Sequence, residues 1–174
     1  MPSLQKITPC LWFDTQAEDA AKFYASIFKN SGIGKISRYG KEGFEIHHQP
    51  QGSAMMVTFR LEGQEFTALN GGPLFRFNEA ISFIVSCETQ GEIDEYWDQL
   101  GRGGDPKAQQ CGWLKDKFGL SWQIVPAALA DLMSSGDAAQ TERVMKALLQ
   151  MKKLDLAELK RAYEGKQSVG HSAG

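Results

Sequence analysis

The chain has 174 residues, of which 42% are hydrophobic and 23% are charged, and its formal net charge at pH 7 is −2. A chain of this length and balance can bury a core without disulfides or structural metals, as one domain or as two fused small modules. The small net charge excludes a global basic field that would recruit nucleic acid or anionic lipid. We therefore expect no nucleic-acid partner and no membrane partner.

Signals for export and for disulfide bonding are lacking in the sequence. The N-terminal segment does not combine a basic start with a signal-type apolar core, and no apolar run is long enough to cross a bilayer. Cys10, Cys87 and Cys111 form an odd set without CxxC spacing, which favours a reducing compartment over a disulfide framework. These features predict a cytoplasmic protein.

The first half of the chain predicts the order β-α-β-β-β. A short apolar run at 7–13 is typical of a strand, Asp14 is placed to cap the next element, and apolar residues recur at helical spacing along 17–28. A tight hairpin turn is expected at Glu62 and Gly63. The other three strands of this module, which spans 1–73, are predicted at 35–41, 53–63 and 64–72.

The second half, 74–126, repeats this pattern with a shorter middle. The segment ETQGEIDEYW at 88–97 resembles DTQAEDAAKFY at 14–24, so that Asp14 aligns with Glu88 at an offset of 74 residues. An internal repeat of this kind indicates two copies of one structural unit. The elements expected here are strands at 81–88, 112–118 and 120–126, a helix at 91–101, and a loop at 101–111 that can hold one more, poorly marked strand.

A helical extension is predicted at 127–165, with Asp137 and Asp155 as N-caps, and a flexible tail at 166–174. A four-stranded module covers its own sheet faces poorly, whereas two such modules together can build a curved sheet around a cavity. The predicted fold class is therefore α+β, with two βαβββ modules forming a curved mixed sheet and additional C-terminal helices.

Four stretches of the sequence resemble one known family. They are ITPCLWFDTQAEDAAKFYASIF, FTALNGGP, CGWLKDKFGLSWQIVP and the C-terminal RVMKALLQMKKLDLAELKRAY. These segments resemble the PhnB-like family, often labelled 3-demethylubiquinone-9 3-methyltransferase-like. That family lies within the vicinal oxygen chelate superfamily of glyoxalase I, bleomycin-resistance proteins and extradiol dioxygenases. The resemblance implies the same paired-module fold.

The resemblance also indicates where a metal site would lie. In metal-dependent relatives each module supplies one ligand from its first strand and one from its last, and the matching positions here are Thr8, Thr67, Ser82 and Gln123. A slip of one or two residues would offer Glu65 in place of Thr67. Hydroxyl groups are poor ligands for transition metals at neutral pH, so Gln123 is the one metal-ligand candidate. We expect no cofactor, with a divalent metal as the alternative.

Other candidate site residues come from the strands and their turns. Asn70 lies in NGGP, which is either a turn or the rim of a cavity. Cys10 shares a strand face with Thr8 and is, with Glu65, a candidate catalytic residue. The adjacent histidines His47 and His48 are expected on or beside a strand, where neighbouring side chains cannot readily chelate one ion, and an exposed or loop pair is the favoured interpretation. The aromatic residues on or beside strands are Trp12, Phe66, Phe75, Phe77, Phe83, Trp113 and Trp122.

Strand alternation turns about half of these aromatic residues toward the concave face, where they would line an apolar pocket. The sequence thus predicts a protein that binds a small organic molecule in an aromatic-lined cavity. The ligand-binding candidates are Thr8, Trp12, Thr67, Asn70, Ser82, Trp113, Trp122 and Gln123.

Two alternatives from other functional classes stay open. One is a metal-dependent lyase, isomerase or dioxygenase, and the other is the 3-demethylubiquinone 3-methyltransferase activity of the family label. A methyltransferase that uses S-adenosylmethionine normally needs a nucleotide-binding α/β sheet, which this β-rich pattern does not predict. Because members of the superfamily commonly dimerise, the resemblance further implies a homodimer.

Overall fold

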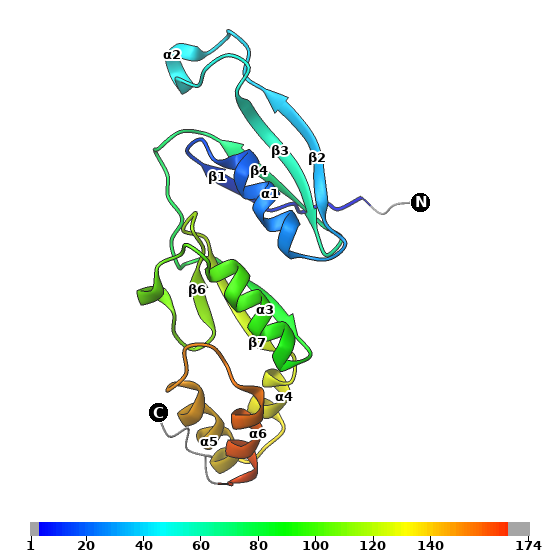
Figure 1. Cartoon of the computed structure of the whole chain (residues 1–174), viewed down its shortest axis with the longest axis vertical. Helices are drawn as coiled ribbons and strands as arrows, with labels where there is room; N and C mark the ends of the chain where they lie inside the picture. The colour runs from blue at the N-terminus through cyan, green and yellow to red at the C-terminus, as the bar shows by residue number, and fades with distance from the viewer. Residues whose placement is uncertain (1–3, 167–174) are drawn as a thin grey trace. The chain divides into compact units, whose positions relative to one another are not determined.

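The structure is a computed structural model that describes residues 4–166, and these divide into two compact units between Phe77 and Asn78. In the first unit the predicted order β-α-β-β-β is confirmed, with one additional helical turn (Figure 1). Its elements are β1 (Cys10–Phe13), α1 (Ala17–Ile27), β2 (Gly32–Arg38), α2 (Phe44–His47), β3 (Ala54–Leu61) and β4 (Gln64–Asn70).

The strands of the first unit form one mixed sheet in the order β1-β4-β3-β2. β1 runs parallel to β4, and the other neighbours are antiparallel. Residues Glu62 and Gly63 have φ values of 46° and 80°, the left-handed conformations that a two-residue hairpin requires. The turn predicted between β3 and β4 is therefore confirmed.

Helix α1 covers one face of this sheet. Its buried residues lie on one side of the helix and pack against alternate strand residues such as Leu11, Val57 and Ala68. The other face, which we call open face A, carries the intervening residues. It consists of Cys10, Trp12, Met56, Thr58, Arg60, Glu65, Thr67 and Leu69.

The N-terminus of α1 corrects one expectation. Asp14 does not cap it; the N-cap position is Gln16, whose side chain makes no capping hydrogen bond. The Ala17 N–H instead donates to Oδ1 of Asn70 at 2.8 Å. Asn70 can replace a local cap because it ends β4 directly opposite Phe13 at the end of β1, so the sheet itself brings the amide to the helix.

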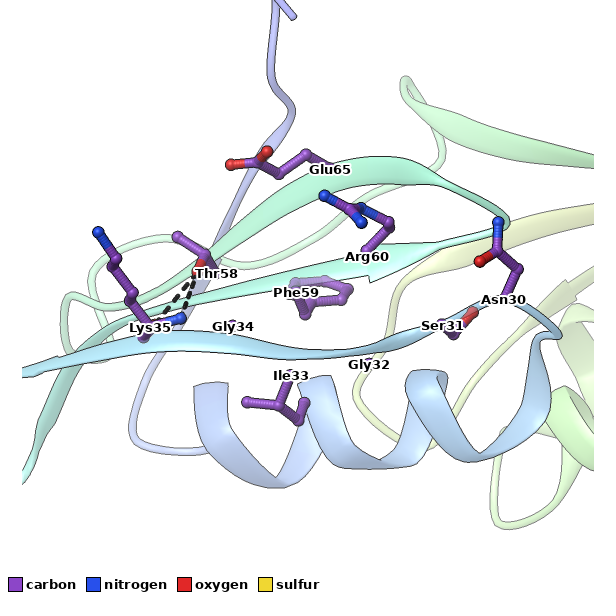
Figure 2. Close-up of a pocket in the computed structure, with 10 residues that line it drawn as sticks. All are labelled: Asn30, Ser31, Gly32, Ile33, Gly34, Lys35, Thr58, Phe59, Arg60 and Glu65. Atoms are coloured by element: carbon purple, nitrogen blue, oxygen red, sulfur yellow. Dashed lines mark hydrogen bonds between the residues drawn. The ribbon is translucent and has the colours of Figure 1, made fainter. Parts of the chain in front are cut away.

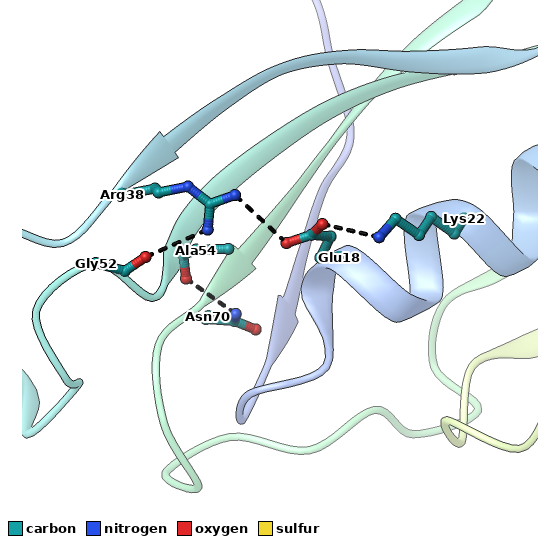
Figure 3. A network of polar contacts seen from close by, with 6 residues as sticks. All are labelled: Glu18, Lys22, Arg38, Gly52, Ala54 and Asn70. Atoms are coloured by element: carbon teal, nitrogen blue, oxygen red, sulfur yellow. Dashed lines mark hydrogen bonds and ion pairs between the residues drawn. The ribbon is translucent and has the colours of Figure 1, made fainter.

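A polar network continues around this helix end (Figure 3). Glu18 is 2.8 Å from Lys22 and 3.9 Å from Arg38, and Arg38 also donates to the carbonyl of Gly52 at 3.2 Å. The hydrogen bond and the charge of Lys22 lower the pKa of Glu18, with a smaller contribution from Arg38. The network therefore connects α1 to β2 and to the loop before β3.

The histidine pair does not lie on a strand. His47 ends the short helix α2, and His48 follows it with a φ of 53°. Nδ1 of His47 accepts the Gln49 N–H at 3.0 Å, and Nε2 lies 3.1 Å from the Glu42 carbonyl. Gly43, in the left-handed conformation, starts a helical turn inside the connection between β2 and β3, so the pair lies in the segment that joins the two strands, as an exposed or loop pair would.

The second unit holds the second sheet, in the order β5-β7-β6. β5 pairs parallel with β7, and β6 pairs antiparallel with it. Together with the first unit this confirms the α+β fold class. The elements are β5 (Ser82–Cys87), α3 (Gln90–Gly101), the 3-10 helix η1 (Pro106–Ala108), β6 (Trp113–Lys115) and β7 (Ser121–Pro126).

Within residues 4–166 the loop at 101–111 holds no strand, so the second sheet has three strands where the first has four. Asp105 caps η1 by accepting the Lys107 N–H, and Pro106 lacks the N–H that a central strand would donate. A Cβ atom at Gly104 would overlap the carbonyl of Lys115. The loop backbone thus packs directly on the start of the β6–β7 connection instead of adding a strand.

The C-terminal extension forms three helices around a small core, against which Val125 of β7 also packs. Asp137 caps α5 through a capping box, and Asp155 caps α6, so both predicted N-caps are confirmed. Val144 of α5, Leu154 of the connection between α5 and α6, and Leu159 of α6 are fully buried in this core. Their bounds are α4 (Leu129–Ser134), α5 (Ala138–Leu148) and α6 (Leu156–Glu164).

Apart from Lys166, the predicted flexible tail at 166–174 lies outside the described residues. Among the helices that the structure describes, none combines the length and the apolar character needed to span a membrane.

Candidate functional site

Open face A brings several of the predicted site residues into one row. Cys10 pairs with Thr67 across the β1–β4 ladder, and Thr67 pairs with Thr58 across the β4–β3 ladder. Residues that pair directly across strands project from the same face. This row therefore presents a thiol and two hydroxyls side by side.

The strand registers show which positions of the two sheets are equivalent. Cys10 lies beside Thr67 in the first sheet, and Ile84 lies beside Gln123 in the second. The internal repeat aligns Cys10 with Ile84, so Thr67 and Gln123 occupy equivalent positions. Glu65 is two residues before Thr67 and is therefore not the equivalent of Gln123.

Thr8 and Glu65 are held near each other by Gln5. Nε2 of Gln5 donates to the Glu65 carbonyl at 2.9 Å and lies 3.5 Å from Oγ1 of Thr8, and its Oε1 accepts the Glu65 N–H at 3.0 Å. The side-chain amide of Gln5 thus contacts the backbone at the start of β4. The carboxylate of Glu65 has no hydrogen bond or ion pair among residues 4–166 and projects from open face A.

The second sheet has a corresponding face, which we call open face B, opposite the face that α3 covers. Nε2 of Gln123 donates to Oγ of Ser82 at 2.9 Å, and Trp113 lies directly across the ladder from Gln123. Ser121 pairs with Ser82, and its Oγ is buried without a hydrogen-bond partner within the described residues. Open face B consists of Ser82, Ile84, Trp113, Lys115, Ser121 and Gln123.

Trp12 is fixed in position on open face A. Its Nε1–H donates to the Gly72 carbonyl at 2.9 Å, and its ring meets Phe75 edge-to-face with centroids 5.0 Å apart. The indole also lies directly on the backbone of Gly71, where a Cβ atom would overlap the ring. Gly71, the first glycine of NGGP, thus leaves space for the tryptophan ring in addition to its place in the turn.

Replacing Gly71 by alanine is therefore expected to displace the Trp12 indole and to lower the free energy of unfolding by about 1–3 kcal/mol, the usual cost of overpacking. Urea unfolding and the indole N–H resonance of Trp12 would report both effects. The matched control is Gly40→Ala, because a Cβ atom at Gly40 meets nothing within 4 Å. Equal stability of the two variants would contradict the contact.

Two of the predicted ligand-binding residues point elsewhere and serve the fold. The Asn70 side chain is buried, and it donates to the Ala54 carbonyl at 3.0 Å while accepting the Ala17 N–H. Trp122 lies on the α3-covered face, and its Nε1–H donates to Oδ2 of buried Asp116 at 2.9 Å. The other six divide between the two units: Trp12 and Thr67 lie on open face A with Thr8 just before β1, and Ser82, Trp113 and Gln123 lie on open face B.

The surroundings of Cys10 and Cys87 do not activate these two thiols as nucleophiles. Partial burial raises the pKa of Cys10, although the residue as a whole is exposed. Burial, with a contribution from the charge of Glu92, raises the pKa of Cys87 to about 11. Nucleophilic cysteines have lowered pKa values, so both thiols stay protonated at neutral pH.

Open face A also extends into a groove that the sequence analysis did not identify (Figure 2). Its volume is about 500 Å³. The alternating glycines Gly32 and Gly34 are the sequence signal that could have revealed it. Other lining residues include Lys35, Thr58, Arg60 and Glu65.

The residues at the superfamily's metal-ligand positions do not fit a catalytic transition metal. Three of the four side chains are hydroxyls, and the fourth, Gln123, uses its amide nitrogen on Ser82. Among residues 4–166 no group of three or more His, Cys, Asp and Glu side chains is placed to hold a metal ion. We therefore derive no reaction step through a metal.

The comparisons with known proteins agree on the fold. The family model described as 3-demethylubiquinone-9 3-methyltransferase matches residues 5–125. The PhnB protein from Bacillus cereus is 39% identical, with a TM-score of 0.60, over 71% of this chain and 100% of that protein. A comparison with curated proteins gave no match.

More distant structures show the fold alone. Protein PA1353 from Pseudomonas aeruginosa is 18% identical, with a TM-score of 0.54, over 71% of this chain and 98% of that one. The fosfomycin resistance protein FosX from Listeria monocytogenes, complexed with Mn(II) and sulfate, is 14% identical with a TM-score of 0.50, over 78% of this chain and 98% of that one. With the family model matching well over half of its residues, the chain belongs to the PhnB-like 3-demethylubiquinone-9 3-methyltransferase family.

Proposed function

We propose that this protein binds a small organic molecule on its open sheet faces through aromatic, hydroxyl and amide side chains, without a full catalytic metal site. The observation that carries the proposal is the donor set at the equivalent strand positions. Thr67 and Gln123 occupy the positions that supply metal ligands in metal-dependent relatives of this protein. The Gln123 side chain is instead hydrogen-bonded to Ser82. Such groups bind organic ligands through hydrogen bonds.

The aromatic residues support the same proposal. Trp12 and Trp113 lie on open faces A and B and are only partly buried, so each offers ring surface beside polar side chains. Mostly apolar sites with a few well-placed polar groups are typical of small-molecule binding. An amphipathic or aromatic ligand suits this combination.

Methyl transfer, the activity in the family's description, has less support. S-adenosylmethionine-dependent transferases normally hold their donor at a nucleotide-binding α/β sheet with a glycine-rich loop. The sheets described within residues 4–166 contain only one parallel strand pair each, and the turns after β1 and β5 read DTQ and ETQ. We therefore derive no methyl-transfer step.

The four tryptophans provide the test. In a fragment screen observed through the ¹⁵N indole resonances, bound ligands should shift the signals of Trp12 or Trp113. Trp97, a buried residue of α3, and Trp122, buried on the sheet face that α3 covers, serve as internal controls. If fragments shift only the Trp97 and Trp122 signals, or shift no indole signal, the proposal is wrong.

We further propose that the protein is a homodimer. In the described residues β1 pairs only with β4 and β5 only with β7, so each sheet ends in an edge strand. Exposed edge strands of folded proteins are usually covered or paired, and a two-fold contact between copies is the commonest solution. Light scattering at micromolar concentration should give twice the mass of 19.3 kDa; a monomer mass would contradict the proposal.

A further inference from the structure

The groove beside open face A has a floor of bare backbone. Gly32 and Gly34 are alternate residues of β2, so both would project side chains on the same side if they had them. Ile33, between them, points the other way, toward α1 (Figure 2). The pair of glycines thus leaves a strip of β2 uncovered next to Thr58 and Arg60 of β3.

The two glycines have different reasons to be there. The register between β2 and β3 shifts between Ile33 and Ile36, and Oγ1 of Thr58 accepts the Lys35 N–H at 2.7 Å within this bulge. A Cβ atom at Gly34 would lie 2.5 Å from that hydroxyl oxygen, so the bulge requires Gly34. A Cβ atom at Gly32 would meet nothing within 4 Å, and its φ is not positive. The backbone conformation therefore does not require glycine at position 32, in contrast to position 34.

Two cations line this space without partners. The side chains of Arg60 and Lys35 have no hydrogen bond or ion pair within the part of the chain that the structure describes. Arg60 lies directly across the ladder from Glu65, yet the two make no ion pair. The groove thus holds two cationic side chains and one carboxylate, Glu65, in a chain of net charge −2.

We propose that this groove binds the anionic group, a carboxylate or a phosphate, of a small organic ligand. The guanidinium of Arg60 provides a planar pair of donors suited to either group, and Lys35 adds a positive charge at the other end. The strip above Gly32 admits a flat part of the ligand. The inference rests on the proposed function, because Thr58, Arg60 and Glu65 belong to open face A.

The test compares three probes that share a ring: benzoate, phenyl phosphate and uncharged benzyl alcohol. Binding is followed by ¹⁵N chemical shifts of the backbone and of the tryptophan indoles. Arg60→Gln removes the proposed anion contact, and Gly32→Leu fills the groove. The controls are Arg76→Gln, which removes an exposed arginine elsewhere, and Gly40→Leu, where the added Cβ atom also meets nothing within 4 Å.

We expect the two anions to shift the backbone resonances of residues 30–35 and 58–60. Both should bind more tightly than benzyl alcohol. Arg60→Gln should weaken anion binding roughly tenfold or more, the usual effect of losing a charge-assisted hydrogen bond. Gly32→Leu should weaken it similarly, whereas the two controls should leave it unchanged. Added salt should weaken the binding of the two anions and leave the binding of benzyl alcohol unchanged.

Two outcomes would overturn the inference, and they are distinguishable. In the first outcome the probes shift the indole signals of Trp12 or Trp113, but benzoate and benzyl alcohol bind equally, or both groove variants bind the anions like the wild type. The proposed anion site is then wrong, and the proposed function stands. If no probe shifts the groove or either open-face indole, both the anion site and the proposed binding role of the open faces are contradicted.

Discussion

Replacing Asn70 by alanine is expected to lower the free energy of unfolding by about 3 kcal/mol, because it leaves two buried backbone groups without partners and removes a helix cap. Asn70 is 4% exposed, and its side chain joins the Ala17 N–H of α1 to the Ala54 carbonyl of β3. Urea unfolding monitored by tryptophan fluorescence would measure the change. The loss is a large part of the stability of an ordinary domain.

Two further variants make this result specific. Asn70→Asp keeps an oxygen for the Ala17 N–H but loses the donor to Ala54, so it should be less harmful than alanine at the helix end and still destabilising overall. Asn78→Ala is the matched control, since Asn78 is exposed and, within residues 4–166, its Oδ1 accepts only the Ala80 N–H. A change below 1 kcal/mol for Asn70→Ala, about the size of one ordinary hydrogen bond, would show that α1 does not depend on this contact.

Replacing Asp116 by asparagine is the second change with a large expected effect, again about 3 kcal/mol for a buried charged acceptor. Oδ1 accepts the N–H groups of Phe118 and Leu120 at 2.8 and 3.1 Å, and Oδ2 accepts the Trp122 Nε1–H. The amide can serve the backbone through its oxygen, but its NH₂ group then faces the indole N–H, which is also a donor.

This prediction also has a clear readout. The variant should unfold at lower urea concentration, and the indole resonance of Trp122 should move while that of Trp12 does not. Asp105→Asn is the control, since Asp105 is exposed and its side chain accepts only the Lys107 N–H among the residues that the structure describes. An unchanged unfolding midpoint for Asp116→Asn would mean that the β6–β7 turn forms without the carboxylate.

The elements that could be predicted from the sequence are those specified by local signals. A short apolar run and apolar residues at helical spacing predicted β1 and α1 of the first module. The Glu62–Gly63 turn predicted its hairpin, and acidic residues before helices predicted the caps of α5 and α6. Each depends on residues a few positions apart. The cap of α1 could not be found in this way, because Asn70 and Ala17 are 53 positions apart.

The candidate site was predictable only in part for a related reason. Alternation along a strand divides residues into two sets, but it does not say which set a helix covers. Trp12 and Trp122 were therefore indistinguishable in the sequence, although one lies on an open face and the other beneath α3. The bulge at Gly34 is equally hidden, since it depends on the hydroxyl of Thr58 on another strand.

The central claim is that this member of the PhnB-like family recognises an organic ligand through hydrogen bonds and aromatic surface, and not through a bound transition metal. It is tested most directly by the metal content of the protein, purified without chelator or metal column and then titrated with Mn(II). We predict substoichiometric metal and no saturable effect of Mn(II) on the side-chain amide resonance of Gln123. Stoichiometric metal, or saturable one-to-one broadening of that resonance, would contradict the account.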